Sequence, residues 1–593
     1  MYVELQYGLD VKCIKRSKIV PGLYGVVSKK EVDLHEKIYT YFYSSKHSET
    51  LNEELRYKNF LYGRSVINKF LNDRVLYEDK NLIIAFEGVY FNKKSILTSN
   101  EIANKYKKNS INFIKDIKGE FSGFIYDKQL DKLFLYNDHL STKPIYYYKD
   151  NDYFIFASEF KVITKLLQGL AIEKVLDYDG VYSMLTFGYM LGELTFEKQT
   201  KKLDYATILE IDSELEITKH KYFRYEKKEN FNLTKKEIIE NIDKLLVSSI
   251  DRCWKKDKEY GYSHLSFLSG GLDSRVNVLL AKQLGYTNTL TMTFSQSGSS
   301  DEKIAQEISN KEGFKHIFYS LNNGKFLEAN LEKYIEANDG LVNLTGSAAG
   351  YAFLSTINFK HFGALHTGQI GDLLFGSYVK KSFDVSSGIM SNQKELLKKI
   401  SSFVEFRKKY NDNSEIFGYE QRVINGALNG DRTVSHYVDM VSPFYDRELI
   451  EFCLTIPDKY KKDEAIYLDW FNKKHKKVSQ YKWESAGIKP RYSKIVNIAK
   501  IIKRYKNAIL RRIGFNINDM NPFDIWMRQN KKILKTLDKY FEDNINNIDD
   551  LQLKEQLSDM YKRKIEFSHY GRNNKYLVVT LLLALNLHFG KTK

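Results

Sequence analysis

Apolar and polar residues alternate over short segments in the first third of the chain. The segments are separated by Asp, Asn, Lys and Gly residues typical of turns, and they comprise residues 81–91, 121–127, 132–138, 145–150 and 153–159. A period of two predicts strands with one buried face, so residues 1–225 are expected to form an α+β domain of layered antiparallel sheets. Helices are expected around residues 51–71 and 98–116.

The hydrophobic period changes after a polar connection at residues 225–230. Helical spacing places six apolar residues on one face of a predicted helix: Ile238, Ile242, Leu245, Leu246, Ile250 and Trp254. Strand and helix patterns then alternate through residues 262–268, 272–285, 288–294, 301–312 and 316–321. This βαβαβ order predicts a parallel sheet with right-handed crossovers, and therefore a second, α/β domain over residues 226–593.

A glycine-rich turn, Ser269-Gly270-Gly271-Leu272-Asp273-Ser274, directly follows the first strand of this second domain. Ligands of parallel sheets bind outside the carboxyl ends of the strands, and glycines let the backbone approach them closely. The serine hydroxyls and the amides of the next helix can donate to phosphate oxygens. Asp273 would repel a bare phosphate, so the turn predicts a pyrophosphate site in which Asp273 binds a divalent cation. A capped tight turn is the structural alternative.

The stretch at residues 361–378 repeats this design. A strand runs into Thr367-Gly368-Gln369-Ile370-Gly371-Asp372, and a helix follows. Mg²⁺ bound to a pyrophosphate takes few protein ligands, so two aspartates from separate loops suit it. Asp372 is therefore predicted to share the ion with Asp273; a helix cap is the alternative.

The bulk composition limits the classes of protein. Apolar residues make up 43% and charged residues 28% of the 593 positions, which excludes a disordered chain. The net charge of +17 could attract nucleic acid, a membrane or an acidic substrate, but the lysines are scattered apart from residues 473–512. A solvated surface is the favoured interpretation, and we expect no nucleic-acid partner.

Cysteine usage and apolar runs suggest the compartment. Cys13, Cys253 and Cys453 lie far apart and form no CxxC pair, as expected in a reducing cytoplasm. The first residues lack a basic segment followed by an apolar one, so no signal peptide is expected. The longest apolar run, residues 577–589, is too short to span a bilayer and predicts a buried terminal helix.

Taken in order, these motifs resemble the asparagine synthetase family over most of the chain. SGGLDS (269–274), TGQIGD (367–372) with FGSY (375–378), and SPFYD (442–446) with LTIPDKYKK (454–462) resemble its PP-loop synthetase domain. Residues 118–148 and 154–163 resemble its glutaminase domain. The resemblance implies an Ntn-hydrolase-like fold followed by a PP-loop, HUP-like fold of the adenine nucleotide α-hydrolase type.

The resemblance also implies an activity. ATP with Mg²⁺ would be attacked at its α-phosphate by a substrate carboxylate, giving an acyl-adenylate and pyrophosphate, and ammonia or an amine would then form an amide. The implied pyrophosphate loop is Ser269, Gly270, Gly271, Asp273 and Ser274, and the implied metal ligands are Asp273 and Asp372. Leu268, Phe294 and Gly368 would line the adenine pocket. Lys462 would stabilise the departing pyrophosphate, with Lys461 as the competing alignment.

The glutaminase half departs from the family at four positions. Tyr2 occupies the place of the nucleophilic cysteine, and Cys13 lies eleven residues further along. Glu87-Gly88-Val89 aligns with the family's N-G-E, Asn100 replaces a glutamine-binding aspartate, and no R-G-P-D segment is found. We therefore predict that this half does not hydrolyse glutamine and serves as a scaffold, partner surface or substrate-binding lobe.

The synthetase half departs at one position. Gln369 replaces an acid that could accept a proton from the incoming amine, and an amide side chain cannot do so. The amine could therefore be ammonia, an amino sugar or a peptide amine. The carboxylate could belong to a small molecule, a peptide or a glycan. A PP-loop tRNA-modifying enzyme and a non-catalytic protein of the same fold are the alternative functions. A homo-oligomer is compatible with the sequence.

A basic helical insertion is expected near residues 473–515. Within residues 494–513, Ile498, Ile501, Ile502, Tyr505, Ile509 and Ile513 can share one helical face, and Lys500, Lys503, Arg504, Lys506 and Arg511 the opposite one. Packing of the apolar face on its own domain is the favoured interpretation. Peripheral contact with the inner face of a membrane is the second, and nucleic-acid binding the third.

Overall fold

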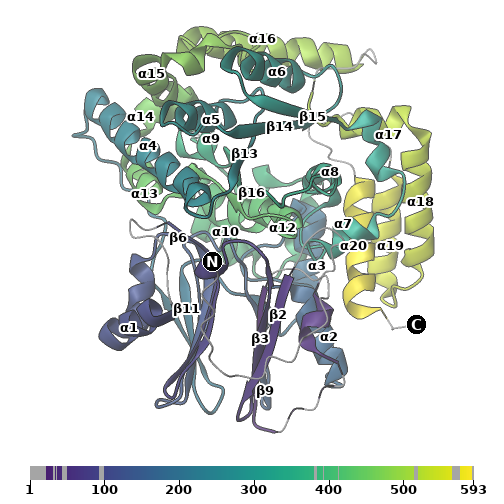
Figure 1. The fold of residues 1–593 in the computed structure, drawn as a ribbon. Helices are drawn as coiled ribbons and strands as arrows, with labels where there is room; N and C mark the ends of the chain where they lie inside the picture. The colour runs from purple at the N-terminus through teal and green to yellow at the C-terminus, as the bar shows by residue number, and fades with distance from the viewer. Residues whose placement is uncertain are drawn as a thin grey trace.

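Three sheets organise the part of the molecule that the structure describes (Figure 1). The computed structural model describes residues 22–30, 32, 34, 36–42, 50–91, 99–379, 383–391, 393–411, 413–512, 519–563 and 574–590. The N-terminal strands, at the bottom of Figure 1, form two antiparallel sheets, and the strands above them form a parallel sheet. The α+β half followed by an α/β half is confirmed.

Among the described residues, both N-terminal sheets have six strands with antiparallel neighbours throughout. The first has the order β10 (Thr200–Lys202), β8 (Tyr146–Lys149), β9 (Tyr153–Ala157), β1 (Gly22–Ser28), β3 (Phe60–Ile67) and β2 (Thr50–Tyr57). The second has the order β12 (Ile217–Lys221), β11 (Thr207–Ile211), β7 (Lys132–Asn137), β6 (Gly119–Asp127), β5 (Leu82–Tyr90) and β4 (Val75–Glu78).

The alternation along each strand explains why the two sheets stack. In β9, Phe154 and Phe156 join the core between the sheets, while Ile155 faces helix α2 (Phe160–Gly169) on the other side. In β6, Phe124 joins the same core, and Ile125 packs in the cluster that contains α1 (Ser99–Asn109) and the 3₁₀ helix η3 (Ser110–Asp116). The period of two therefore produces four layers: helix, sheet, sheet, helix.

The helix expected at residues 51–71 is wrong. These residues form the hairpin of β2 and β3, with Lys58 in the left-handed conformation at its turn, followed by the short η2 helix (Leu71–Asp73). β3 is paired on both sides and buried at every position, so its apolar residues run without the alternation that marks a half-exposed strand. The helix expected at residues 98–116 is confirmed by α1 and η3.

The parallel sheet has five strands. Their order is β15 (Lys315–Ser320), β14 (Thr289–Ser295), β13 (Ser263–Phe267), β16 (Phe362–His366) and β17 (Met440–Val441). Its helices include α4 (Lys235–Glu259), α5 (Asp273–Gln283) and α6 (Ser300–Glu312). The chain leaves β13 towards β14 on one side, whereas β16 pairs on the other. Diverging connections of this kind open a crevice at the carboxyl ends of the strands.

Four helices at the C-terminus form a bundle beside the sheets, drawn in yellow in Figure 1. They are α17 (Phe523–Gln529), α18 (Lys531–Ile545), α19 (Leu551–Lys562) and α20 (Asn574–Phe589). α20 is buried along most of its length, and the His588 ring lies 4.4 Å from that of Phe160 in α2. The buried terminal helix is thus confirmed. None of the described helices has the length and apolar character needed to cross a membrane.

A buried ionic network joins the antiparallel sheets to the parallel sheet. Arg74 donates to Glu87 Oε1 at 3.0 Å and to both oxygens of Asp439, the residue before β17, at 2.9 and 2.7 Å. Lys143 Nζ lies 2.6 Å from Asp439 Oδ1. Burial would raise the pKa of Asp439, but Arg74 and Lys143 outweigh it and hold the pKa well below its usual range.

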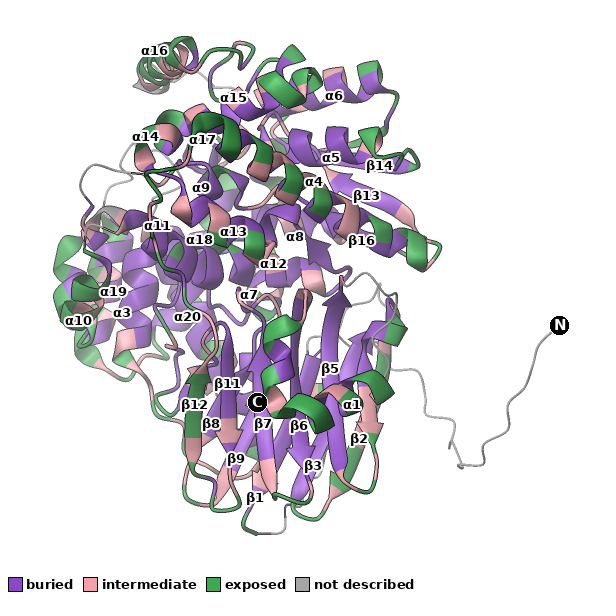
Figure 2. Ribbon diagram, turned by 90° about the vertical axis from the view of Figure 1, so that its left-hand side faces the viewer, coloured by how far each residue is buried: buried purple, intermediate pink, exposed green. Residues whose placement is uncertain are grey.

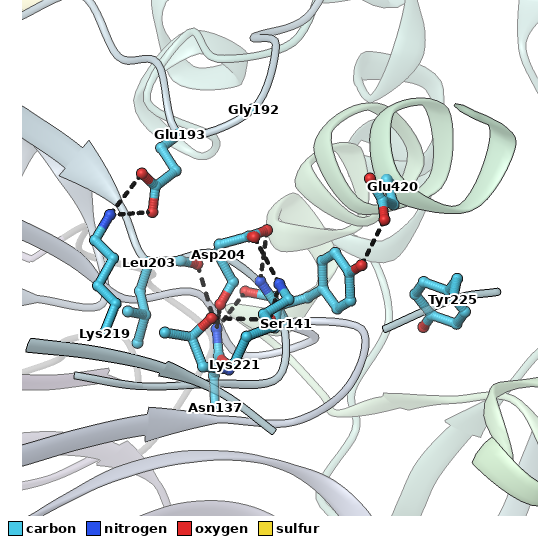
Figure 3. A network of polar contacts seen from close by, with 12 residues as sticks. Asn137, Ser141, Gly192, Glu193, Leu203, Asp204, Lys219, Lys221, Tyr225 and Glu420 are labelled. Atoms are coloured by element: carbon cyan, nitrogen blue, oxygen red, sulfur yellow. Dashed lines mark hydrogen bonds and ion pairs between the residues drawn. The ribbon is translucent and has the colours of Figure 1, made fainter. Parts of the chain in front are cut away.

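Figure 3 shows a second polar junction between the two halves. The Tyr205 hydroxyl donates to Glu420 of the π-helical segment η8 (Gly418–Ala427) at 2.5 Å. Nearby, Lys221 Nζ is 2.5 Å from Asp204 Oδ2. Lys202 Nζ also crosses the junction and donates to Asn425 Oδ1 at 2.9 Å. Polar contacts at two places thus fix the antiparallel sheets against the second half of the chain, one beside β17 and one at η8.

Helix α16 (Ser493–Arg512) lies at the edge of the molecule, where Figure 2 shows much of it exposed. Val496 and Ala499 contact the domain, and Lys500 and Lys503 pair with Glu464 and Glu484. The apolar face does not pack on the domain: Ile498, Ile502, Tyr505 and Ile509 are 59–64% exposed and Ile501 is 48% exposed. The favoured interpretation, in which this apolar face packs on its own domain, is therefore wrong. Ile513 lies outside the described residues.

The network around Asp439 predicts a large effect on stability. Replacing Asp439 with Ala leaves the buried Arg74 without its bidentate partner, which should cost about 3–5 kcal/mol. Because the folded pKa of Asp439 is depressed, its contribution is present at neutral pH and lost as the pH falls through the acid range. Thermal unfolding at pH 7 should show a clearly lowered midpoint.

The matched control for this change is Glu214→Ala. Glu214 pairs with Lys29 at 3.3 Å, but its side chain is 76% exposed, so its loss should change stability by less than about 1 kcal/mol. Equal midpoints for the Asp439→Ala and Glu214→Ala variants would contradict the importance of the buried network.

Candidate active site

A cavity of about 460 Å³ opens at the carboxyl ends of β13, β14 and β16. Its walls come from the loop between β13 and α5, from β14, from the loop between β16 and α9 (Gly371–Leu374), and from α12 (Leu428–Ser435). The predicted site residues that line it are Leu268, Ser269, Gly271, Asp273, Ser274, Phe294, Gly368 and Asp372. Its volume lies in the range typical of small-ligand sites.

The glycine-rich turn is held in shape by its own polar groups. The Ser269 N–H donates to Ser274 Oγ at 3.0 Å, and the Gly271 N–H donates to Ser269 Oγ at 3.1 Å. The Gly270 N–H donates to Asp301 Oδ1 at 2.9 Å, so Gly270 faces α6 rather than the cavity. The turn leads directly into the N-terminus of α5, where backbone amides favour an anionic ligand.

Arg275 anchors the turn from behind, which the sequence analysis missed. Its fully buried guanidinium donates to the carbonyl oxygens of Gly270 at 3.0 Å, Val478 at 3.2 Å, Tyr481 at 3.2 Å and Lys482 at 2.6 Å. Burial lowers the pKa of Arg275 to about 10. The available signal was an arginine in the first turn of α5, directly before the apolar residues Val276, Val278, Leu279 and Leu280, since a buried arginine rarely lacks partners.

The two predicted metal ligands meet across the loops. The Asp372 N–H donates to Asp273 Oδ2 at 3.0 Å. A Cβ at Gly368 would lie 2.3 Å from the Ser274 nitrogen, and one at Gly371 would lie 2.5 Å from Asp273 Cγ, so only glycine allows this approach. Between them, Ile370 takes a left-handed conformation, with φ of 62°, which is strained for a β-branched residue.

The charges at this meeting point suit a divalent cation. Burial, with repulsion from Asp372 and Glu464, raises the pKa of Asp273 well above its ordinary value. Asp372 is more open and accepts a hydrogen bond from the Ser377 hydroxyl at 3.1 Å. Carboxylates gathered in this way favour a bound cation, since it relieves their repulsion and keeps both ionised. Asp273 and Asp372 are the residues that could hold Mg²⁺.

The other wall of the cavity is apolar. Leu268 is buried, and the half-buried Phe294 packs against Phe267 and Phe353 with ring centroids 5.5 and 5.9 Å away. Ala349, Val434 and Met440 complete this wall. An apolar slot next to a glycine-rich turn at a helix N-terminus fits a planar base joined to a polyphosphate.

The two candidate lysines lie outside the lining of the cavity. Lys462 is exposed. Lys461 is fully buried, and its Nζ lies 2.5 Å from Glu415 Oε1 and 3.2 Å from the Cys453 carbonyl oxygen. Lys461 is thus engaged elsewhere, which leaves Lys462 as the residue that could turn towards a departing anion.

The side of the cavity near Gln369 carries a polar group that the sequence did not reveal. The Gln369 Nε2 donates to Asp431 Oδ1 at 2.8 Å, and its Oε1 accepts from the Tyr445 hydroxyl at 2.9 Å. Burial raises the pKa of Asp431 to about 7, although the hydrogen bond from Gln369 opposes the shift. Asp431 lies in α12, in a segment with no motif, so no spacing pointed to it.

The residues that align with a glutamine-binding site are packed inside the fold or lie at its surface. The side chain of Glu87 is buried against Arg74, Val89 is buried in β5, and Asn100 is exposed on α1. A Cβ at Gly88 would lie 2.1 Å from the Glu120 carbonyl oxygen, so the backbone there is packed closely against β6. Tyr2 and Cys13 lie outside the described residues.

Two family models match the chain in succession. The glutamine amidotransferase domain matches residues 74–223, and the asparagine synthase domain matches residues 241–423. A putative asparagine synthetase [glutamine-hydrolyzing] 2 of Methanocaldococcus jannaschii is 25% identical over 425 residues, which cover 66% of this chain and 80% of the relative.

Two relatives from Bacillus subtilis are similar to the chain over shorter shares of their length. Its asparagine synthetase [glutamine-hydrolyzing] 2 is 24% identical over 68% of this chain and 61% of the relative. Its asparagine synthetase [glutamine-hydrolyzing] 1 is 25% identical over 44% of this chain and 40% of the relative. The two domain matches, in this order and with these relatives, show that the chain belongs to the asparagine synthetase family.

Proposed function

We propose that this chain is an ATP-dependent ligase that adenylates a substrate carboxylate and transfers the acyl group to ammonia or an amine. The observation that carries the proposal is the meeting of Asp273 and Asp372 over a phosphate-binding turn, beside an apolar slot. The family membership supports the same class of reaction.

Each part of the cavity has a role in the proposed adenylation. Leu268, Phe294 and Gly368 hold the adenine, while the turn and its two serines hold the β- and γ-phosphates. Asp273 and Asp372 hold Mg²⁺, which would neutralise charge on the phosphate oxygens. The substrate carboxylate oxygen bonds to the α-phosphorus as the bond to the β-phosphate oxygen breaks, and Lys462 stabilises the pyrophosphate that leaves.

The N-terminal half is proposed to lack glutaminase activity. Tyr2 stands where a thiol nucleophile is needed, and a phenol cannot form the thioester. Glu87 forms an ion pair with Arg74, which also pairs with Asp439, so Glu87 contributes to the junction between the halves. Nitrogen would therefore come from free ammonia or directly from the amine substrate.

The alternative of tRNA modification by cysteine chemistry is disfavoured. Cys253 and Cys453 are both buried, and burial raises the pKa of Cys453 to about 12. A buried thiol with a raised pKa is neither nucleophilic nor accessible to a large substrate. Cys13 lies outside the described residues.

We also propose that α16 places the enzyme at the inner face of an anionic membrane, within the cytoplasm. The exposed apolar residues of α16 fall within an arc of about 120° on a helix of 3.6 residues per turn. The helix carries seven basic residues and no acidic one. This charge is complementary to anionic headgroups, and the isoleucines can enter the boundary between headgroups and acyl chains. A carboxylate carried on a lipid-linked molecule would be accessible there.

Adenylation predicts pyrophosphate exchange that depends on a carboxylate. With Mg²⁺, ATP and radiolabelled pyrophosphate, the wild type should exchange label in the presence of one member of a panel of aspartate, glutamate and a hexuronic acid. Asp273→Ala should lower the rate by at least about 100-fold, because charge in the transition state loses its counter-ion. The matched control is Asp152→Ala, which should exchange normally: the Asp152 side chain is 41% exposed in the hairpin between β8 and β9. Equal rates for both variants would refute the role of Asp273.

Glutamine should not serve as the nitrogen donor. Incubation with glutamine and ATP should release no glutamate above the enzyme-free blank, because position 2 carries no thiol. The preparation that shows pyrophosphate exchange is the one to assay, which excludes an inactive sample. Glutamate release above that blank would contradict the prediction.

The exposed face of α16 predicts binding to anionic vesicles. The protein should float with vesicles containing phosphatidylserine, float less with pure phosphatidylcholine, and be released by high salt. Ile498→Ser/Ile502→Ser should weaken binding about tenfold or more, because the variant loses two exposed apolar side chains that would be buried in the bilayer.

Val404→Ser is the matched control for the vesicle experiment, because Val404 is 64% exposed on α10 (Phe403–Tyr410) and should not contribute. Wild-type protein that stays unbound with both vesicle types would contradict the membrane proposal. So would a dimer in solution that the Ile498→Ser/Ile502→Ser variant dissociates, since the face would then bind a second copy.

A further inference from the structure

Asp431 has an unused hydrogen-bonding oxygen beside the proposed reaction centre. It lines the cavity together with Asp273, Asp372 and Gln369. Its Oδ1 accepts from Gln369, whereas its Oδ2 is shielded from solvent and has no hydrogen-bond partner among the described residues. A carboxylate buried without a full set of donors is costly, so such an oxygen calls for an explanation.

Hydrogen bonds hold both polar atoms of the Gln369 side-chain amide and the backbone carbonyl of Gln369. The Tyr445 hydroxyl donates to Oε1, which leaves Nε2 directed at Asp431, and the Ser442 hydroxyl donates to the Gln369 carbonyl at 3.0 Å. An amide held in this way can orient Asp431 but cannot accept a proton. The hydrogen bonds thus run from Tyr445 through Gln369 to Asp431 and end at a carboxyl group.

We propose that Asp431 is the general base of the amide-forming step and that Gln369 is the positioning residue that holds it. The inference rests on the proposed ligase function. The amine nitrogen bonds to the carbonyl carbon of the acyl-adenylate, the bond from that carbon to the phosphate oxygen of AMP breaks, and AMP leaves with the electron pair. The proton lost by the nitrogen passes to the Asp431 carboxylate, which lines the cavity.

The surroundings of Asp431 suit this task. Its pKa of about 7 lies near neutral pH, where a general base is both available and strong enough to act. The phenol of Tyr445 keeps its proton, since burial and the charge of Asp431 raise its pKa well above the ordinary value. Arg432, the next residue of α12, does not compensate Asp431 because it pairs with Asp339 at 2.9 Å.

The position of the base narrows the class of acceptor. A carboxylate at this place can accept the one proton that a neutral amine nitrogen loses as it bonds to the acyl carbon. A strongly basic amine, such as ammonia or a primary alkylamine, needs such a base, because its nitrogen holds that proton tightly after attack. A weakly basic nucleophile such as hydroxylamine needs no such base to attack an acyl-adenylate.

The test separates the two chemical steps in Asp431→Asn. The amide oxygen introduced by this substitution can still accept from Gln369, so the cavity should keep its shape and pyrophosphate exchange should stay within about twofold of wild type. Hydroxamate formation with hydroxylamine should persist, while amide formation with ammonium chloride or a primary-amine panel should fall by about 10²–10⁴-fold. The double variant Gln369→Glu/Asp431→Asn, which moves the acid to position 369, should recover part of the loss.

The titration of the Asp431 carboxyl group can be measured without substrate. Infrared difference spectra should show a protonated carboxyl band that titrates near pH 7 in the wild type and is missing from Asp431→Asn. Equal amide formation by wild type and Asp431→Asn, or spectra with no such band, would overturn the role of Asp431 alone. Absence of pyrophosphate exchange by the wild type with every carboxylate would instead refute the proposed function on which the inference rests.

Discussion

The contact between two loops across the ends of β13 and β16 is the constraint on which the proposed enzyme depends. The Asp372 amide donates to Asp273, and Gly368 and Gly371 leave no space for a side chain between the loops. The contact brings carboxylates together where burial disfavours charge, and a divalent cation would relieve that cost. The buried Arg275 in the first loop and the strained Ile370 in the second also hold the two loops in place.

The two halves of the chain contribute to this site in different ways. The parallel sheet supplies the loops that meet at the cavity, and the antiparallel sheets support it through Arg74, Glu87 and Asp439. Asp439 immediately precedes β17, the strand next to β16, so the junction is continuous with the sheet that carries the cavity. A half that resembles a glutaminase thus stabilises the synthetase half, whether or not it binds a ligand of its own.

The sequence predicted the parts of the molecule that local pattern determines. The strand β9 and the order of strands and helices from β13 to β15 follow from periodicity, and the turn at Ser269–Ser274 follows from its composition. The hairpin of β2 and β3 was missed because pairing on both sides buries β3 completely, which removes the alternation. Asp431 and Arg275 were missed because their roles arise from contacts with Gln369 and with the segment at residues 478–482, far away in the chain. The exposed face of α16 shows the same limit, since an amphipathic pattern does not reveal what covers the face.

The most direct test of the central claim is a crystal structure with Mn²⁺ and α,β-methylene-ATP, in which anomalous scattering locates the ion. The account predicts a Mn²⁺ peak that is bound by a carboxylate oxygen from each of Asp273 and Asp372 and by phosphate oxygens of the analogue, with the adenine against Phe294. A well-ordered analogue whose phosphates lie away from the Ser269–Ser274 turn, or a metal ion that neither aspartate binds, would contradict it.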